Sequence, residues 1–164
     1  YVSNDNNVTV FLANGSGGYG AGQHYDTSGV ASDVGLGDFD EDGDLDIVVS
    51  KFLVSESCSV LLGNGNGTFG AAVDYPARRL VEQLIVEDID ADGHLDVLMA
   101  SNISDVVLLR GVGDGTFSPR ECFASGRGAD WIDVVDFNGD GWLDFVGTSQ
   151  SSLEVRVSLS LGVP

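Results

Sequence analysis

Basic residues are scarce in this sequence: 7 lysines and arginines stand against 26 aspartates and glutamates, which gives the 164-residue chain a formal net charge of -19. Nucleic acids and anionic membrane surfaces are themselves negative and repel such a chain, so neither is an expected partner. Apolar runs are also too short for a membrane-spanning helix, which needs roughly 18 residues. Intrinsic disorder would require low hydrophobicity, whereas the mean hydropathy is +0.11 and 9% of the residues are aromatic. The composition predicts one folded, acidic domain with enough apolar residues for a core.

Cysteine and histidine are equally rare, with two residues of each. Cys58 and Cys122 are too few for a disulfide scaffold and too far apart for a metal knuckle, so we expect buried free thiols, with a bridge as the alternative. His94 lies in an acidic segment and His24 between glycines, and neither has the partners of a Ser/His/Asp or Cys/His catalytic set. We therefore expect no enzyme, although carboxylate pairs could in principle serve a glycosidase.

Glycine and aspartate, by contrast, are abundant, and both recur in register along the chain. The acidic segment at residues 37–49 returns at 87–99 and 135–147, with offsets of 50 and 48 residues. A glycine-rich segment keeps the same offsets, and its three copies are residues 10–20, 60–70 and 108–118. Two independent motifs in one register indicate an internal repeat of about 48–50 residues.

The apolar runs within each repeat predict strands, because they are short, rich in Val, Ile and Leu, and bounded by Gly, Asn and Asp. No window has the periodicity and caps of a helix. The strands expected in the middle of the chain are residues 57–63, 68–75, 83–88 and 95–101. Four short antiparallel strands per repeat predict an all-β fold of β-propeller blades, since a lone four-stranded sheet needs neighbouring sheets to cover its faces.

The expected domain organisation follows from the repeats. Residues 1–164 form a single β-propeller segment with an extra terminal strand at 153–160. The three expected repeats are residues 7–56, 57–104 and 105–152.

The acidic loop inside each repeat has the donor set of a calcium site. Its pattern, D-x-D-x-D-G-x-x-D with Asn at position 3 of the last copy, places side-chain oxygens at positions 1, 3, 5 and 9, and position 7 can add a backbone carbonyl. Such oxygen ligands suit Ca²⁺ better than Mg²⁺, which keeps its waters and prefers octahedral geometry. The predicted ligands of three Ca²⁺ sites are Asp38, Asp40, Asp42, Asp44 (carbonyl) and Asp46; Asp88, Asp90, Asp92, His94 (carbonyl) and Asp96; and Asp136, Asn138, Asp140, Trp142 (carbonyl) and Asp144.

An EF-hand is excluded, because the position of its bidentate Glu holds Val49, Met99 and Gly147. Ordinary polar turns are the competing interpretation of any single Asp-Gly segment. Three copies in register favour the metal, since adjacent carboxylates without a cation would repel one another.

These loops, together with the turn at residues 63–72 (G-N-G-N-G-T-F-G-A-A), resemble the FG-GAP/VCBS repeats of integrin-α-type β-propellers. The resemblance implies structural calcium, a binding face and a secreted or cell-surface location. The sequence departs from the family at the turn: Gly22 and Ala72 stand where the family has Pro, and residues 18–19 and 118–119 also differ. Because family propellers commonly have seven blades, we expect either part of a larger propeller or self-association through open blade edges.

Strand direction predicts where a partner would bind. The acidic loops and glycine-rich turns are alternate connections of an antiparallel meander, so the remaining connections share the opposite end. That end collects four of the seven basic residues, Lys51 among them, and the proposed ligand face is Arg78, Arg79, Arg127 and Trp131. A solvated polar rim is the competing interpretation.

The favoured function is a calcium-stabilised extracellular module for adhesion or for protein or glycan recognition. A sugar-binding lectin and a non-catalytic structural domain of a larger secreted protein or fibre are the alternatives. The Gly-x-Gly-x-x-Gly matches at residues 15–20 and 65–70 predict no dinucleotide site, because no helix follows them. Glycosylation sequons, partly explained by the repeated turn, occur at Asn7, Asn14, Asn66 and Asn102.

Overall fold

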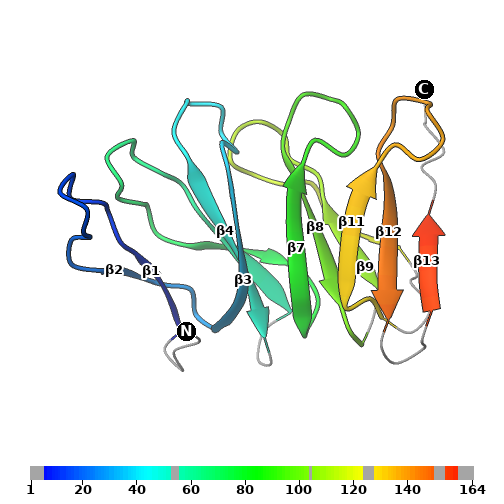
Figure 1. Ribbon diagram of the computed structural model, residues 1–164, viewed down its shortest axis with the longest axis horizontal. Helices are drawn as coiled ribbons and strands as arrows, with labels where there is room; N and C mark the ends of the chain where they lie inside the picture. The colour runs from blue at the N-terminus through cyan, green and yellow to red at the C-terminus, as the bar shows by residue number, and fades with distance from the viewer. Residues whose placement is uncertain (1–5, 53–55, 104, 124–127, 150–153, 159–164) are drawn as a thin grey trace.

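The computed structural model describes residues 6–52, 56–103, 105–123, 128–149 and 154–158. The described residues form strands, turns and loops without a helix, and hence without any helix long and apolar enough to span a membrane. The strands make four antiparallel sheets that follow one another along the chain and stand side by side (Figure 1). The predicted all-β antiparallel fold is confirmed.

Each sheet is a meander in which consecutive strands are neighbours, as expected of short strands joined by tight connections. The first sheet pairs β1 (Asn7–Val10) with β2 (Gln23–Asp26). The second contains β3 (Val30–Gly37), β4 (Asp46–Phe52), β5 (Ser57–Leu61) and β6 (Val73–Pro76). The third contains β7 (Val81–Glu87), β8 (Asp96–Ser101), β9 (Val106–Leu109) and β10 (Glu121–Phe123). The fourth contains β11 (Trp131–Val135), β12 (Asp144–Ser149) and β13 (Glu154–Ser158).

The strand predictions for the middle of the chain differ from the structure mainly at one turn. β7 and β8 lie within two residues of the expected ranges, but β5 ends at Leu61 and β6 begins only at Val73. The residues between them form a glycine turn closed by a bridge between Gly63 and Phe69 and by a 2.7 Å hydrogen bond from the Gly70 amide to the Leu62 carbonyl. Glycine lets the chain adopt the positive φ angles that this turn requires, so the apolar residues flanking it leave the ladder.

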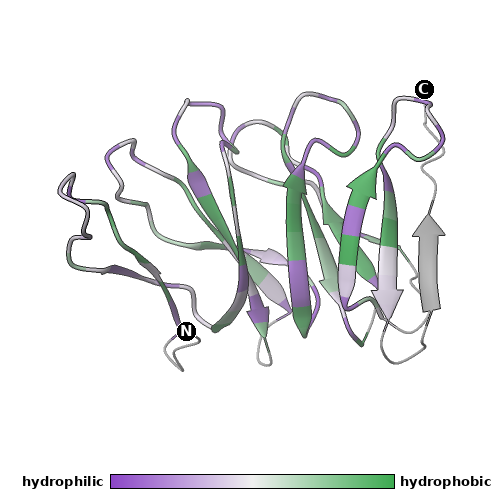
Figure 2. Ribbon diagram, in the orientation of Figure 1, coloured by the Kyte–Doolittle hydropathy of each residue, from purple (hydrophilic) through white to green (hydrophobic). Residues whose placement is uncertain are grey.

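The core lies between successive sheets rather than beneath one of them. β8 is buried along its whole length and β4 along all but its last residue, because each is covered on both faces. Their middle residues, 47–49 in β4 and 97–100 in β8, are therefore apolar on both faces, while polar residues lie toward the strand ends (Figure 2). Between the second and third sheets the buried residues include Val48, Cys58, Val60, Leu84, Val97, Met99 and Val107.

The second and third sheets are in close contact at Gly35 of β3. A Cβ atom there would lie 2.6 Å from side-chain atoms of both Leu84 and Val86 on β7, so a larger residue fits only if these side chains move. A hydrogen bond reinforces the contact, since the Leu84 amide donates to Asp33 Oδ2 at 2.9 Å. A similar bond joins the next two sheets, from the Ile132 amide to Gln83 Oε1 at 2.7 Å.

Both cysteines are free, but only one is buried. Cys58 lies in the core, and burial raises the pKa of its thiol to about 12. Cys122 is exposed, so the prediction of two buried thiols is correct for Cys58 and wrong for Cys122, which lies on the short outer strand β10.

Candidate metal centre and recognition surface

Three acidic loops lie at one edge of the sheets, where each joins the first two strands of a sheet. The first acidic loop (38–46) joins β3 to β4, the second (88–96) joins β7 to β8, and the third (136–144) joins β11 to β12. These loops lie at the top of Figure 1, on the same edge as the glycine turns after β5 and β9. We call this the acidic edge.

The three loops share a backbone conformation that bends the chain around its own carboxylates. Positions 4 and 6 have φ between 56° and 95° in every loop, at Glu41 and Gly43, Ala91 and Gly93, and Gly139 and Gly141. As a result the amide at position 6 donates to the carboxylate at position 1, at 3.0 Å from Gly43 to Asp38 Oδ2. The glycine at position 6 was expected from the sequence, whereas the left-handed conformation of Glu41 and Ala91 was not.

The first loop presents a cluster of carboxylate oxygens. Asp38, Asp40 and Asp42 each offer an oxygen within 4.8 Å of the others. Desolvation, together with the negative charges of Asp42, Asp46 and Asp38, raises the pKa of Asp40. A cluster of hard oxygen donors under mutual repulsion fits a cation such as Ca²⁺, which takes six to eight oxygen ligands.

The second loop has a different cluster, made by Asp88, Asp90 and Asp96. Burial raises the pKa of Asp96 to about 6, although backbone amides and Arg110 act in the opposite direction. Arg110 also contacts Asp90 directly, through Nη1 and Oδ2. The charge balance of the second loop is therefore unlike that of the first.

The aspartate at position 9 ties the first and second loops to the rest of their sheets. Asp46 is 1% exposed and accepts two backbone hydrogen bonds of 2.7 Å, from Phe39 to Oδ2 and from Gly63 to Oδ1. Asp96 repeats this with the amides of Ile89 and Gly111 at 3.0 and 2.9 Å. The bond to Gly63 joins the acidic loop to the glycine turn, which gives the shared register of the two motifs a structural reason. The sequence analysis treated these residues as ligands and did not find this role.

The third loop is arranged less favourably for a cation. Among the described residues, three carboxylates converge in the first and second loops but not in the third. Asn138 at position 3 donates through Nδ2 to Asp140 Oδ2 at 2.9 Å, and the Gly141 amide lowers the pKa of Asp136. The predicted ligands of this loop are thus present at one turn, with an amide in place of the carboxylate at position 3.

His94, expected to offer its carbonyl, uses its ring to connect neighbouring loops. Its Nδ1 lies 2.5 Å from Oε1 of Glu41 in the first loop. The hydrogen bond to Glu41 raises the pKa of His94. The carbonyl ligands proposed at Asp44, His94 and Trp142 stay predictions.

The proposed ligand face lies at the edge opposite the acidic edge, as strand direction predicts. Arg79 is exposed and Trp131 is 58% exposed at the start of β11. Arg78 is half-buried and donates to Asp105 Oδ2 at 3.4 Å. Arg127 lies outside the described residues. The face therefore offers Arg79 and Trp131 to a partner, while Arg78 is engaged within the chain.

Lys51 is not part of that surface. Its side chain is 0% exposed and pairs with Asp74 at 2.6 Å between Nζ and Oδ1. A buried ammonium requires such a partner, and the Ser57 hydroxyl at 3.3 Å adds a second acceptor. The sequence expectation that placed Lys51 among the exposed cations is wrong, because β4 is central and covered on both faces.

The four sequon asparagines differ in their surroundings. Asn14 and Asn66 are exposed in glycine turns, where their Oδ1 atoms accept bonds from Ser16 and Thr68. Asn7 and Asn102 are half-buried, and Asn102 Nδ2 donates to Glu82 Oε1 at 2.6 Å. Of the four, only Asn14 and Asn66 are exposed, and glycosylation at any of them stays a prediction.

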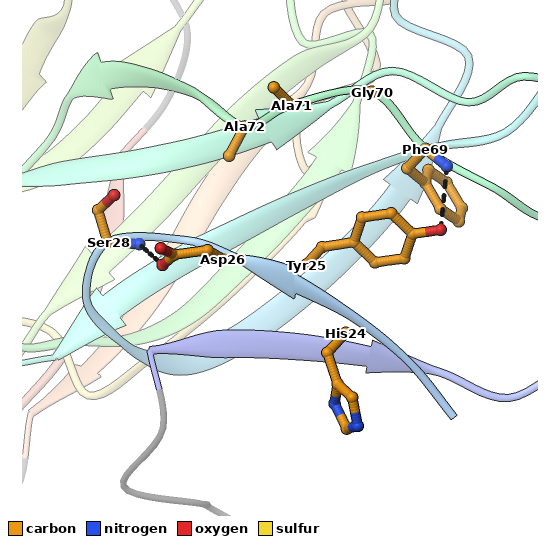
Figure 3. Close-up of a pocket in the computed structure, with 8 residues that line it drawn as sticks. All are labelled: His24, Tyr25, Asp26, Ser28, Phe69, Gly70, Ala71 and Ala72. Atoms are coloured by element: carbon orange, nitrogen blue, oxygen red, sulfur yellow. Dashed lines mark hydrogen bonds between the residues drawn. The ribbon is translucent and has the colours of Figure 1, made fainter. Parts of the chain in front are cut away.

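A surface pocket of about 420 Å³ lies between the first two sheets, and the sequence analysis did not find it. It is lined by His24, Tyr25, Asp26, Ser28, Phe69, Gly70, Ala71 and Ala72. Figure 3 shows Tyr25 directed at Phe69, whose amide donates to the Tyr25 hydroxyl at 3.2 Å, while the His24 ring points away. The rings of Tyr25 and Phe69 meet edge to face at 5.5 Å. The pocket combines apolar ring surface with the carboxylate of Asp26.

The same ring contact recurs one repeat later, which is the sequence signal that could have located the pocket. Tyr75 and Phe117 also meet edge to face, at 5.1 Å. In the next repeat, 50 or 48 residues further along the chain, the positions that correspond to Asp26, Ser28 and Ala72 hold larger or more rigid side chains. They are Pro76, Arg78 and Arg120. Small residues around the first ring pair therefore leave room for a ligand.

Comparison with protein families identifies the repeat. Residues 88–147 match the model of the FG-GAP-like repeat. This part of the chain is similar to the FG-GAP-like repeat. The match begins at the second acidic loop and extends past the third, so the resemblance found from the sequence is confirmed there. No curated protein sequence matches the chain.

Two solved structures share the fold. One is an Agrocybe aegerita lectin described as recognising non-reducing terminal N-acetylglucosamine, with 21% identity and a TM-score of 0.61; the match covers 96% of this chain and 45% of the lectin. The other is the pore of the Photorhabdus luminescens Tc holotoxin, with 17% identity and a TM-score of 0.52, covering 98% of this chain and 8% of that one. The chain thus spans less than half the length of either protein.

Proposed function

We propose that the protein is a calcium-stabilised β-propeller module that recognises a glycan or protein partner outside the cell, with the metal structural rather than catalytic. The observation that carries the proposal is the first acidic loop, where three carboxylate oxygens converge while Asp46 is buried and bonded to the next turn. A cation held there would stabilise the loop and, through Asp46, the turn beside it.

The residues that would hold calcium are those of the acidic loops. Bound Ca²⁺ would supply positive charge that offsets the repulsion among the carboxylates. Asp38, Asp40 and Asp42 would bind it in the first loop, and Asp88, Asp90 and Asp96 in the second. The buried aspartates Asp46 and Asp96 would keep their backbone hydrogen bonds when calcium is bound, because each carboxylate oxygen can accept more than one contact.

The four sheets fit successive propeller blades, each packed face to face on the next. A closed ring needs more blades than these sheets provide. We propose that the additional blades come either from a larger propeller that includes this segment or from a second copy of the chain. In both cases the free edges of the outer sheets would be paired.

Thermal melting with and without calcium tests the proposed metal binding. Extracellular calcium modules have dissociation constants near ~10⁻⁴ M, so 10 mM CaCl₂ should add about 2.7 kcal/mol of stability per site. The melting temperature should therefore rise by several degrees over that in EDTA, with a smaller rise in MgCl₂. The Asp42→Asn/Asp88→Asn variant, changed at one carboxylate of each cluster, should lose most of the response. An unchanged melting temperature of the unmodified chain in calcium and EDTA would overturn the assignment.

Glycan binding is the more specific form of the proposed function, and the pocket beside Tyr25 favours it. Aromatic rings and a carboxylate suit the apolar faces and hydroxyl groups of a sugar. The lectin of similar fold binds N-acetylglucosamine, so glycans ending in that sugar are the first probes to immobilise.

Two variants separate the candidate binding surfaces. Loss of glycan capture in Asp26→Ala, with retention in Arg79→Ala/Trp131→Ala, would assign binding to the pocket, and the reverse pattern would assign it to the opposite edge. If no glycan is captured by a folded, calcium-loaded chain, the lectin function is wrong, and a protein partner or a structural role replaces it.

A further inference from the structure

Arg110 distinguishes the second acidic loop from the first. It follows β9, and its guanidinium lies between two carboxylates from different parts of the sheet. Nη1 contacts Asp90 Oδ2 at position 3 of the loop, and Nε donates to Glu121 Oε1 at 2.8 Å. The side chains of Arg110 and Asp90 are 30% and 27% exposed, so solvent screens this pair only in part.

Within the described residues, no lysine or arginine pairs with the carboxylates of the first loop, and the basic group that contacts this loop is His94, at Glu41. The residue that corresponds to Arg110 is Leu62, which packs against the core between the second and third sheets and lies near Gly115. No ion pair to Asp40 occurs within the described residues, although Asp40 occupies the same loop position as Asp90. The two loops thus share their sequence pattern and differ in what contacts position 3.

Two effects of Arg110 oppose a metal in the second loop. First, the guanidinium occupies Asp90 Oδ2, whereas the Oδ1 atoms of Asp90 and Asp40 alike accept a loop amide, at 3.3 and 3.4 Å, so the two loops differ at Oδ2. A cation would therefore have to share or displace a charge-assisted hydrogen bond. Second, arginine stays protonated, so its positive charge remains beside the site at every physiological pH. Glu121 retains the guanidinium next to the loop even if Asp90 releases it.

We propose that Arg110 makes the second acidic loop the weaker of the two calcium sites, so that the first loop fills at a lower calcium concentration and the second only when Asp90 exchanges Arg110 for the metal. This inference rests on the proposed calcium binding. It assigns the first loop to maintaining the fold and makes the second a site that responds to calcium above the level that saturates the first.

Nuclear magnetic resonance of the full, ¹⁵N-labelled chain can follow each loop separately, because position 6 is a glycine whose amide lies within the loop. Calcium is titrated while the Gly43 and Gly93 amide signals are recorded. We expect Gly43 to saturate first and Gly93 at about tenfold more calcium, as one nearby positive charge opposes binding of a divalent cation. In Arg110→Leu, which installs the residue of the first loop, the Gly93 midpoint should fall about tenfold.

Arg110→Gln provides a second neutral variant with a polar side chain, and the spectrum itself reports whether each variant is folded. Arg79→Leu is the matched control: it removes the same charge at the opposite edge and should leave both midpoints unchanged. If Gly43 responds to calcium but neither Arg110 variant lowers the Gly93 midpoint, the inference is wrong while the calcium site stands. If neither glycine responds in the unmodified chain, both the inference and the proposed calcium binding are wrong.

Discussion

The buried aspartates at position 9 have a role that exposed loop carboxylates lack. Asp46 is buried and accepts amides from its own loop and from the glycine turn. Asp42, by contrast, is exposed, and its Oδ1 accepts an amide only from within the loop. Residues that look equivalent in the repeat therefore contribute to stability in different ways.

Substituting these two residues separates the roles. Asp46→Asn replaces one acceptor oxygen by an NH₂ group that faces a backbone donor, so it should lower the free energy of unfolding by about 2 kcal/mol even in EDTA. Asp42→Asn should cost little in EDTA and should reduce only the stabilisation gained from calcium. Urea denaturation with and without calcium measures both. Equal losses for the two variants in EDTA would contradict the structural role of Asp46.

At the scale of elements, the stacking of the sheets depends on a close approach of β3 and β7. Gly35 provides the space, and the bond from the Leu84 amide to Asp33 fixes the relative height of the strands. The exposed Val34 and Leu36 on either side of Gly35 point to the other face of β3. A glycine within an apolar strand here marks a packing requirement between sheets.

A side chain at Gly35 should therefore separate the second and third sheets. Gly35→Val would place methyl groups where Leu84 and Val86 already lie, and we expect a loss of about 3 kcal/mol from overpacking. Gly70→Ala is the control, since a Cβ there meets only the Leu62 carbonyl oxygen, at an ordinary contact distance of 3.6 Å. Thermal unfolding, monitored by circular dichroism, compares the two variants. Similar melting temperatures would contradict the prediction, because they would show that β7 accommodates the added side chain at little cost.

At the scale of the whole molecule, negative charge is gathered at one edge. Twelve of the 26 acidic residues are aspartates of the three acidic loops, and all three loops lie at the acidic edge. Without a cation these carboxylates repel one another across neighbouring sheets as well as within each loop. The net charge of -19 is therefore in large part a property of the predicted metal sites rather than of a basic partner.

Salt should partly replace calcium in reducing the repulsion among the loop carboxylates. Raising NaCl from 50 to 500 mM shortens the Debye length from roughly 14 to 4 Å, so the melting temperature in EDTA should rise as repulsion is screened. In saturating calcium the same increase in salt should have a smaller effect. Choline chloride at equal ionic strength controls for specific sodium binding. Identical salt dependence with and without calcium would show that the loops contribute little repulsion.

Most of the fold follows from local patterns in the sequence. Short β-branched runs separated by glycine and aspartate predicted the strands, and the two motifs in register predicted both the stacking of similar sheets and the edge at which the acidic loops lie. The exceptions arise where distant residues decide. The exposure of Cys122 and the burial of Lys51 depend on whether a strand is outermost or central, and no local pattern states this.

The sequence by itself determined the oxygen-rich loops, because a turn with carboxylates at alternate positions is specified within nine residues. Only the tertiary structure decided what each carboxylate contacts: Asp46 bonds to a turn 17 residues away, and Arg110, 20 residues after Asp90, pairs with that loop and not with the first. The pocket beside Tyr25 likewise requires Phe69, 44 residues further along the chain. Such differences among repeats come from packing between strands and sheets, and packing brings together residues that the sequence keeps apart.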